Sequence, residues 1–184
     1  MRLVITENYQ ESCRVAAEMI AEVVKNKPNA KLGFATGGTP VPIYKRLAEM
    51  CQKGELDFSQ VSTVNLDEYA GLPGDHPQSY RYFMDENLFN HININKANTF
   101  VANGMGDLEA NAAELERKVF EGGAPDLQLL GIGNNGHIAF NEAADYVVAP
   151  ARVEELTEST IQANARFFDK KEDVPTRAIT MGLR

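Results

Sequence analysis

The segment Lys31-Leu-Gly-Phe-Ala-Thr-Gly-Gly-Thr-Pro40 joins a short apolar run to the start of a helical pattern. Residues 31–35 are typical of a buried strand, and apolar residues then recur at helical spacing from Val41 to Cys51. Proline suits the first turn of a helix, where its missing N–H would have no intrahelical partner. The segment therefore predicts a strand, a tight glycine turn and a helix, which is the repeating unit of a parallel α/β fold.

The same alternation of short apolar runs and helical patterns continues along the chain. We expect strands at residues 3–5, 31–35, 60–66, 99–101, 126–131, 152–156 and 178–181. We expect helices around residues 15–23, 40–51, 80–88, 107–119 and 158–168, with Ser79 and Asp107 as caps and a long polar loop from Asp67 to Pro77. This order predicts a doubly wound, mainly parallel sheet with helices on both faces, a modified Rossmann-like arrangement in three layers.

The last expected strand, at residues 178–181, is followed by only three residues, the last of which is Arg184. A parallel sheet is normally covered on both faces, and little chain remains to cover this strand. The strand could be exposed, it could be covered by another copy in a homo-oligomer, or the chain could be a fragment. We expect residues 1–184 to form a single α/β domain that is incomplete at its C-terminal end.

Composition restricts the class of partner. The chain has 184 residues, 43% hydrophobic and 24% charged, with a net charge of -8. This charge argues against nucleic acid or an anionic membrane as the main partner, whereas a phosphorylated small molecule needs only local donors. The chain shows no signal-peptide pattern and no apolar run long enough to span a bilayer, and Cys13 and Cys51 are expected to be reduced thiols. We therefore expect a cytoplasmic protein.

Three loops follow expected strands, at the edge of a parallel sheet where ligands bind. The first is Thr36-Gly37-Gly38-Thr39, between a strand and a helix N-terminus. Its backbone N–H groups and hydroxyls, with the helix dipole, favour a phosphate cradle. A simple tight turn with a threonine cap is the alternative.

The second loop contains the adjacent carboxylates Asp67 and Glu68. Neighbouring side chains of an extended chain point in opposite directions, so only one can face a ligand. We expect Asp67 to be a general base and Glu68 to meet a structural partner; a solvated acidic loop is the alternative. A metal site is not expected, because no histidine accompanies the pair at a suitable spacing.

The third loop, Gly131-Ile-Gly-Asn-Asn-Gly-His-Ile-Ala-Phe-Asn-Glu142, matches the G-x-G-x-x-G dinucleotide fingerprint. However, His137 and Glu142 stand where that fingerprint needs a helix with buried apolar side chains, so no nucleotide cofactor is expected. An imidazole flanked by Asn135 and Glu142 favours proton transfer near neutral pH over a core histidine. Arg166 could donate two hydrogen bonds to a phosphate, or could be a surface arginine.

With these residues in view, the chain resembles the glucosamine-6-phosphate deaminases. The segments that carry the resemblance fall in the family's order and span nearly the whole chain: 35–40, 65–73, 76–80, 131–142 and 163–169. The resemblance implies the conversion of glucosamine 6-phosphate and water to fructose 6-phosphate and ammonia, without a cofactor. The expected partner is thus a small amino-sugar phosphate.

The resemblance also implies roles for individual residues. Asp67 would take the proton from C2 of the open-chain sugar and return it at C1. His137 would open the pyranose ring, held in place by Asn135 and Glu142. Residues 36–39 would hold the 6-phosphate, and Arg166 would lie near the substrate.

The chain departs from the family pattern in three places. Asn135 stands where part of the family has aspartate, so we expect ring opening to depend less sharply on pH. Asp145 and Glu154 change positions of the allosteric site of regulated relatives, so we do not expect a switch by N-acetylglucosamine 6-phosphate, although Arg152 fits the pattern. Family chains also continue past residue 181 and add a lysine that contacts the phosphate. If the molecule ends at Arg184, we expect catalysis to be weak or lost.

Two alternatives remain open from the sequence. A sugar-phosphate lactonase or isomerase of similar fold would share the phosphate loop, but not the combination of Asp67 with His137 and Glu142. A non-catalytic sugar-phosphate-binding module would bind the ligand without turnover.

Overall fold

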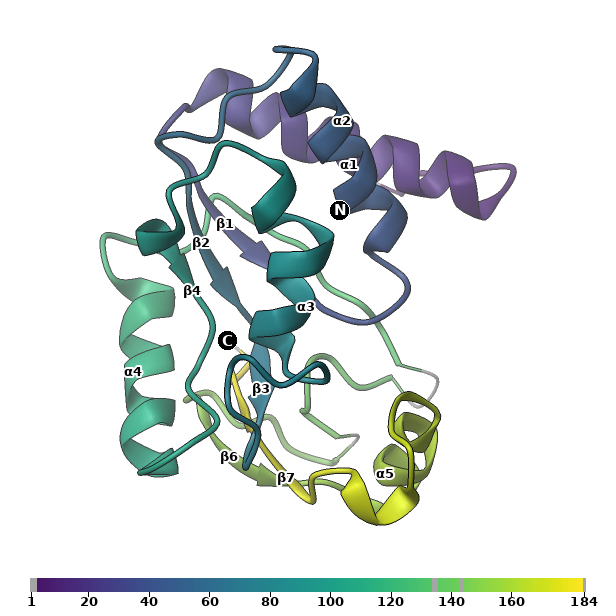
Figure 1. Ribbon diagram of the computed structural model, residues 1–184, viewed down its shortest axis with the longest axis vertical. Helices are drawn as coiled ribbons and strands as arrows, with labels where there is room; N and C mark the ends of the chain where they lie inside the picture. The colour runs from purple at the N-terminus through teal and green to yellow at the C-terminus, as the bar shows by residue number, and fades with distance from the viewer. Residues whose placement is uncertain (1–2, 134–135, 143, 184) are drawn as a thin grey trace.

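A four-stranded parallel sheet forms the centre of the protein (Figure 1). The computed structural model describes residues 3–133, 136–142 and 144–183. The strands are β1 (Lys31–Phe34), β2 (Ser62–Asn65), β4 (Thr99–Phe100) and β5 (Leu127–Gln128), in the order β4-β2-β1-β5. The mainly parallel α/β fold that the sequence predicted is confirmed.

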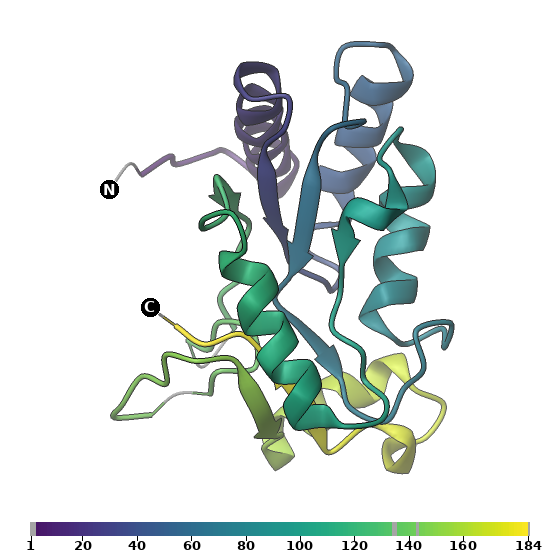
Figure 2. The ribbon, with the colours of Figure 1, turned by 90° about the vertical axis from the view of Figure 1, so that its left-hand side faces the viewer.

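Helices cover both faces of this sheet. Leu32 and Phe34 of β1 pack with α1 (Tyr9–Asn26), α2 (Val41–Gln52) and α3 (Tyr80–Asn87). Val64 of β2 points to the other face and packs with α4 (Leu108–Phe120). Figure 2 shows the sheet between α3 and α4. Side chains alternate between the two faces of a strand, so the sheet contributes residues to a separate core on each side.

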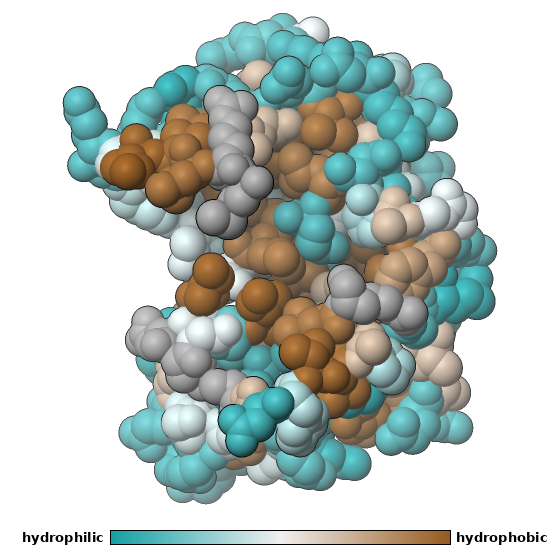
Figure 3. Space-filling model, turned by 180° about the vertical axis from the view of Figure 1, so that it is seen from behind, coloured by the Kyte–Doolittle hydropathy of each residue, from teal (hydrophilic) through white to brown (hydrophobic). Residues whose placement is uncertain are grey.

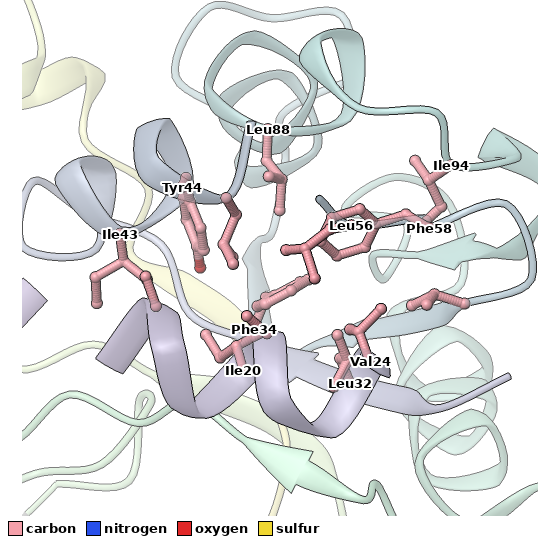
Figure 4. Close-up of a cluster of buried hydrophobic side chains, with 14 of the residues drawn as sticks. Ile20, Val24, Leu32, Phe34, Ile43, Tyr44, Leu56, Phe58, Leu88 and Ile94 are labelled. Atoms are coloured by element: carbon pink, nitrogen blue, oxygen red, sulfur yellow. The ribbon is translucent and has the colours of Figure 1, made fainter. Parts of the chain in front are cut away.

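The larger core lies beneath α1, α2 and α3 (Figure 4). Phe34 and Tyr44 meet edge to face, with ring centroids 5.4 Å apart, and the Tyr44 hydroxyl donates a hydrogen bond to the carbonyl of Ala35. Burying an aromatic ring is strongly favourable, provided that its polar end finds a partner. This bond therefore ties α2 to the end of β1, directly before the glycine turn.

Side chains cap the helices where the sequence predicted them. The Ser79 hydroxyl accepts from the N–H of Tyr82 at 3.0 Å, and Asp107 accepts from the N–H of Ala110 at 3.1 Å. Such caps satisfy N–H groups that have no partner within the helix, and each stabilises by about 1 kcal/mol. At the other end of α4, the Lys31 ammonium donates to the carbonyls of Val119, Glu121 and Gly123.

A second sheet of three antiparallel strands lies below the first, in the order β3-β7-β6. Its strands are β3 (Asp67–Tyr69), β6 (Arg152–Glu155) and β7 (Arg177–Thr180). The prediction of a loop from Asp67 was therefore wrong for its first three residues. The chain changes partner at Leu66, whose N–H donates to Phe34 at 3.3 Å and whose carbonyl accepts from Met181 at 2.8 Å.

Two other predictions were wrong, the first entirely and the second in part. Residues 3–5 form no strand, and Leu3 and Ile5 are 77% and 87% exposed, because no described strand lies beside them to supply backbone partners. The strand expected at residues 126–131 is only Leu127–Gln128 and is half-buried, because it pairs with just two residues of β1. The sequence left open what covers the strand near the C-terminal end; in the structure Ala178 and Ile179 of β7 are fully buried within this chain, on opposite faces of the strand.

Shorter elements complete the structure: α5 (Glu158–Asn164) and the 3-10 helices η1 (Phe89–His91), η2 (Lys96–Asn98), η3 (Ala165–Phe167) and η4 (Lys171–Asp173). Hydrophobic residues also gather on the surface seen from behind (Figure 3). Leu130 and Ile132, beyond β5, are 45% and 79% exposed. None of the described helices combines the length and apolar character needed to span a membrane.

Gly104 provides a test of how tightly the second sheet is held. A Cβ atom at this position would lie 2.1 Å from the carbonyl oxygen of Tyr69 and 2.9 Å from that of Leu72. Gly104→Ala should destabilise the protein by about 1–3 kcal/mol, because backbone must move to admit the methyl group. Denaturant unfolding measures this loss. Gly74→Ala is the matched control, with a Cβ 3.4 Å from Arg81 Cγ; an equal loss in both variants would contradict the packing described here.

Candidate active site

The three loops singled out in the sequence line one cavity of about 720 Å³. The turn at residues 36–39 follows β1, Asp67 lies just beyond β2, and the loop of His137 follows β5. Because β1 lies between β2 and β5, all three meet at the carboxyl edge of the sheet, where parallel sheets bind ligands. Asp67, His137, Arg166 and residues 36–39 all line the cavity, so their predicted convergence is confirmed.

The glycine turn is open towards the cavity. Gly37 has a φ of 98°, a conformation that favours glycine, and a Cβ atom added to Gly37 or Gly38 would meet nothing within 4 Å. The turn precedes α2, and the Tyr9 hydroxyl of α1 donates to the Thr39 carbonyl at 2.7 Å. A hydrogen bond thus attaches the turn to α1, and the chain continues from the turn into α2. The turn lies next to the N-terminus of α2, where anions are favoured.

Asp67 and Glu68 point in opposite directions, as the sequence predicted. Asp67 lines the cavity and is only 7% exposed. Burial, and to a smaller extent the charge of the neighbouring Glu68, together raise the pKa of Asp67 to about 8. A carboxylate in this environment is a stronger base than an exposed one.

Glu68 meets its structural partner at the start of α3. Its carboxylate accepts hydrogen bonds from the backbone N–H groups of Tyr69 at 2.8 Å, Tyr80 at 2.9 Å and Arg81 at 3.0 Å. Burial raises the pKa of Glu68 to about 7, although these N–H groups favour the ionised form. The side chain therefore joins β3 to the first turn of α3, where a negative charge is favourable.

An aromatic wall, which the sequence analysis missed, connects the parts of the site. It consists of Tyr69, Tyr80, Phe140 and Phe168, all of which line the cavity. Ring centroids of Tyr69 lie 4.8 Å from Tyr80, 5.6 Å from Phe140 and 5.9 Å from Phe168. Burial raises the pKa of Tyr69 to about 12 and that of Tyr80 well above its usual value, so both hydroxyls stay neutral. The feature of the sequence that could have revealed this wall was the presence of Tyr69 and Tyr80 close to Asp67 and Glu68.

His137 lies directly over Gly133. A Cβ atom at residue 133 would fall 2.2–2.5 Å from three atoms of the imidazole, and the Gly133 N–H donates to the His137 carbonyl at 2.9 Å. Among the described residues no helix begins at Gly136; residues 138 and 141 instead form a bridge. The glycines thus support an imidazole here, and not the helix start of a dinucleotide fingerprint.

The remaining predicted residues lie at or behind the cavity wall. Glu142 is not part of the lining; its carboxylate accepts from the Thr157 hydroxyl at 3.0 Å and from the Thr160 hydroxyl. Arg166 is exposed at the rim, with its guanidinium 4.7 Å from the ring centroid of Phe167. It is the only lysine or arginine among the described lining residues. Asn135 lies outside the described residues.

Comparison with known proteins identifies the family. A sequence model described as glucosamine-6-phosphate isomerases/6-phosphogluconolactonase matches residues 6–167. The chain belongs to this family. Relatives within it include glucosamine-6-phosphate deaminases from Clostridium beijerinckii, 55% identical, and from Clostridium perfringens, 56% identical. Each match covers 100% of this chain and 76% of the relative, so the chain spans about three quarters of their length.

Solved structures agree with the fold. A structure described as a monomeric glucosamine-6-phosphate deaminase has a TM-score of 0.95 and 44% identity, over 99% of this chain and 76% of its own. A 6-phosphogluconolactonase from Thermotoga maritima has a TM-score of 0.70 at 19% identity, over 98% of this chain and 75% of its own, and shows the likeness of fold alone. The described residues contain no group of three or more His, Cys, Asp or Glu that could hold a metal ion.

The raised pKa of Asp67 predicts a pH-dependent stability difference. Ionisation of Asp67 costs more in the folded than in the unfolded chain, so its contribution to stability is complete below about pH 4 and is lost as the pH rises through about 8. The Asp67→Asn variant has no ionisable group at this position and therefore does not lose this stability at high pH. Its melting temperature should exceed that of the wild type by a few degrees at pH 8.5, and the gain should shrink towards pH 4. A gain that is independent of pH would contradict this origin.

Gly133→Ala should displace the imidazole without unfolding the chain. The ring of His137 can swing away from the new methyl group, whereas the backbone need not move. We expect a melting temperature within about 3 °C of the wild type, which corresponds to roughly 1 kcal/mol. The His137 ring resonances in an NMR spectrum should shift clearly, whereas those of His76 and His91 should not. Unchanged His137 resonances would show that the ring does not lie on Gly133.

Proposed function

We propose that the chain catalyses the conversion of glucosamine 6-phosphate and water to fructose 6-phosphate and ammonia. The observation that carries this proposal is the presence of Asp67 and His137 in one cavity with the turn at residues 36–39. An aldose-to-ketose conversion needs a base for carbon-bound protons and a second group for ring opening. The deaminases at 55% and 56% identity support this activity over others in the family.

The first step is the opening of the sugar ring. His137 accepts the proton of the O1 hydroxyl and returns a proton to O5, so that the C1–O5 bond breaks and C1 becomes an aldehyde. Glu142 and Asn135 are proposed to hold the imidazole in the orientation that this exchange needs. The hydroxyls of Thr157 and Thr160 hold the carboxylate of Glu142 in turn.

The second step is the transfer of a proton from C2 to C1 by Asp67. Removal of the C2 proton gives an enolamine, and protonation at C1 gives an iminium at C2. Water adds to C2 and ammonia leaves, so that fructose 6-phosphate forms. C1 is reduced while C2 is oxidised, and the substrate needs no external electron carrier. A protonated amine at C2 would also favour the ionised form of Asp67, the form that acts as base.

The phosphate is proposed to bind at residues 36–39. Backbone N–H groups of a glycine turn before a helix suit a phosphate, and Arg166 at the rim adds a positive charge. We also propose that the reaction takes place in the cytoplasm, because a charged sugar phosphate does not cross an apolar bilayer readily.

Ammonia release and fructose 6-phosphate formation from saturating glucosamine 6-phosphate test this function. Wild type should release one ammonia for each ketose formed. Asp67→Asn should lower kcat by about 10²–10⁴-fold, because the amide cannot accept the C2 proton. Asp173→Asn, a substitution of the same kind on exposed η4, should match the wild type.

Other outcomes would identify the alternatives. Hydrolysis of 6-phosphogluconolactone without ammonia release would favour a lactonase. Calorimetric binding of glucosamine 6-phosphate without any turnover would favour a binding module. Either result would refute the proposed activity.

A further inference from the structure

The side chain of Asn141 joins three segments beside the site. It is 7% exposed. Its amide nitrogen donates to the carbonyls of Ile138 at 3.0 Å and Met181 at 2.8 Å, and its amide oxygen accepts from Arg152 Nη1 at 2.9 Å. These three bonds fix which way the amide faces, because only the oxygen can accept from a guanidinium.

Arg152 is itself held in a second direction. Its Nε atom lies 2.6 Å from a carboxylate oxygen of Glu154, two residues further along β6 and on the same side of the strand. Both side chains are about three quarters buried. A guanidinium is planar, so bonds from Nε and Nη1 together define its position.

The turn at residues 137–142 carries His137 at one end and Glu142 at the other. Besides Asn141, the N–H of Phe140 donates to the Thr180 hydroxyl of β7 at 3.1 Å. The turn is thus attached to β7 and, through Arg152, to β6. Without the guanidinium, the buried oxygen of Asn141 would lose its partner, which is unfavourable, and only the two hydrogen bonds of its nitrogen would still hold the amide.

We propose that Arg152 is a positioning residue for the site. Arg152 orients Asn141, and Asn141 fixes the turn that places His137 and Glu142, while Glu154 balances the charge of the guanidinium. Arg152 is absent from the cavity lining and acts only through its neighbours. The kinetic consequence rests on the proposed deaminase activity; the structural consequence does not.

The test compares Arg152→Gln with Arg177→Gln, a substitution of the same kind on the neighbouring strand β7, where the side chain is exposed. In NMR spectra, the side-chain amide protons of Asn141 should exchange with solvent faster in Arg152→Gln than in the wild type. The ring resonances of His137 should shift, and those of His76 and His91 should stay. Arg177→Gln should leave all of these signals unchanged.

Kinetics provide the second readout. Arg152→Gln should lower kcat by up to about 100-fold, since misplacing a reacting group by about 1 Å has effects of this size. KM should change by less than about threefold, because residues 36–39 are not disturbed. Arg152→Lys keeps the charge but loses the planar fork, so it should recover part of the activity. It also provides a milder variant if Arg152→Gln does not fold.

The two readouts separate the proposals. If wild type releases no ammonia, the proposed activity fails, and the exchange and ring signals still decide the role of Arg152. Unchanged Asn141 exchange and His137 signals in Arg152→Gln would overturn the positioning role. The positioning role would also be overturned by a loss of kcat that merely follows the fraction of unfolded protein and is the same in Arg152→Lys.

Discussion

The buried carboxylate of Glu68, bonded to the first turn of α3, is the interaction on which the site depends. It accepts from the N–H groups of Tyr80 and Arg81, and the Ser79 hydroxyl accepts from Tyr82, so three otherwise unpaired N–H groups at the start of α3 have partners. Because β3 is extended, turning Glu68 towards α3 turns Asp67 towards the cavity. One interaction therefore places the candidate base, and it brings Tyr80 of α3 against Tyr69 of β3.

The same arrangement makes Asp67 costly to ionise. Two adjacent carboxylates are buried together, and burial raises the pKa of both. Glu68 accepts hydrogen bonds from three backbone N–H groups, whereas Asp67 lines the cavity, so the two side chains differ in role although they are neighbours. Residues that serve a reaction are often unfavourable for stability. Here the unfavourable group is the one that faces the cavity.

Local patterns in the sequence predicted much of this, and the failures share a cause. The parallel strands, the caps Ser79 and Asp107, and the meeting of Asp67 with His137 follow from periodicity, capping and the position of loops after parallel strands. The strand β3 was missed because its partner, β7, lies more than 100 residues later in the chain, and three residues carry little pattern. The aromatic wall was missed for the same reason, since Tyr69, Tyr80, Phe140 and Phe168 come from separate segments. Residues 3–5 were predicted as a strand because they are apolar, but no described strand lies beside them to supply backbone partners.

The charges in the cavity distinguish between substrates that the fold alone does not. The fold is shared with a lactonase at 19% identity, and a glycine turn before a helix would suit any sugar phosphate. A phosphorylated lactone carries only negative charge, and a buried Asp67 carboxylate near it would be repelled. An amino-sugar phosphate carries both signs, and in the proposed binding mode its phosphate lies at residues 36–39 near Arg166 while its amine lies near Asp67. Burial strengthens both the attraction and the repulsion, because a medium of low dielectric screens charge poorly. In the proposed reaction, the burial that makes Asp67 a stronger base would thus also favour a substrate that brings a positive charge to it.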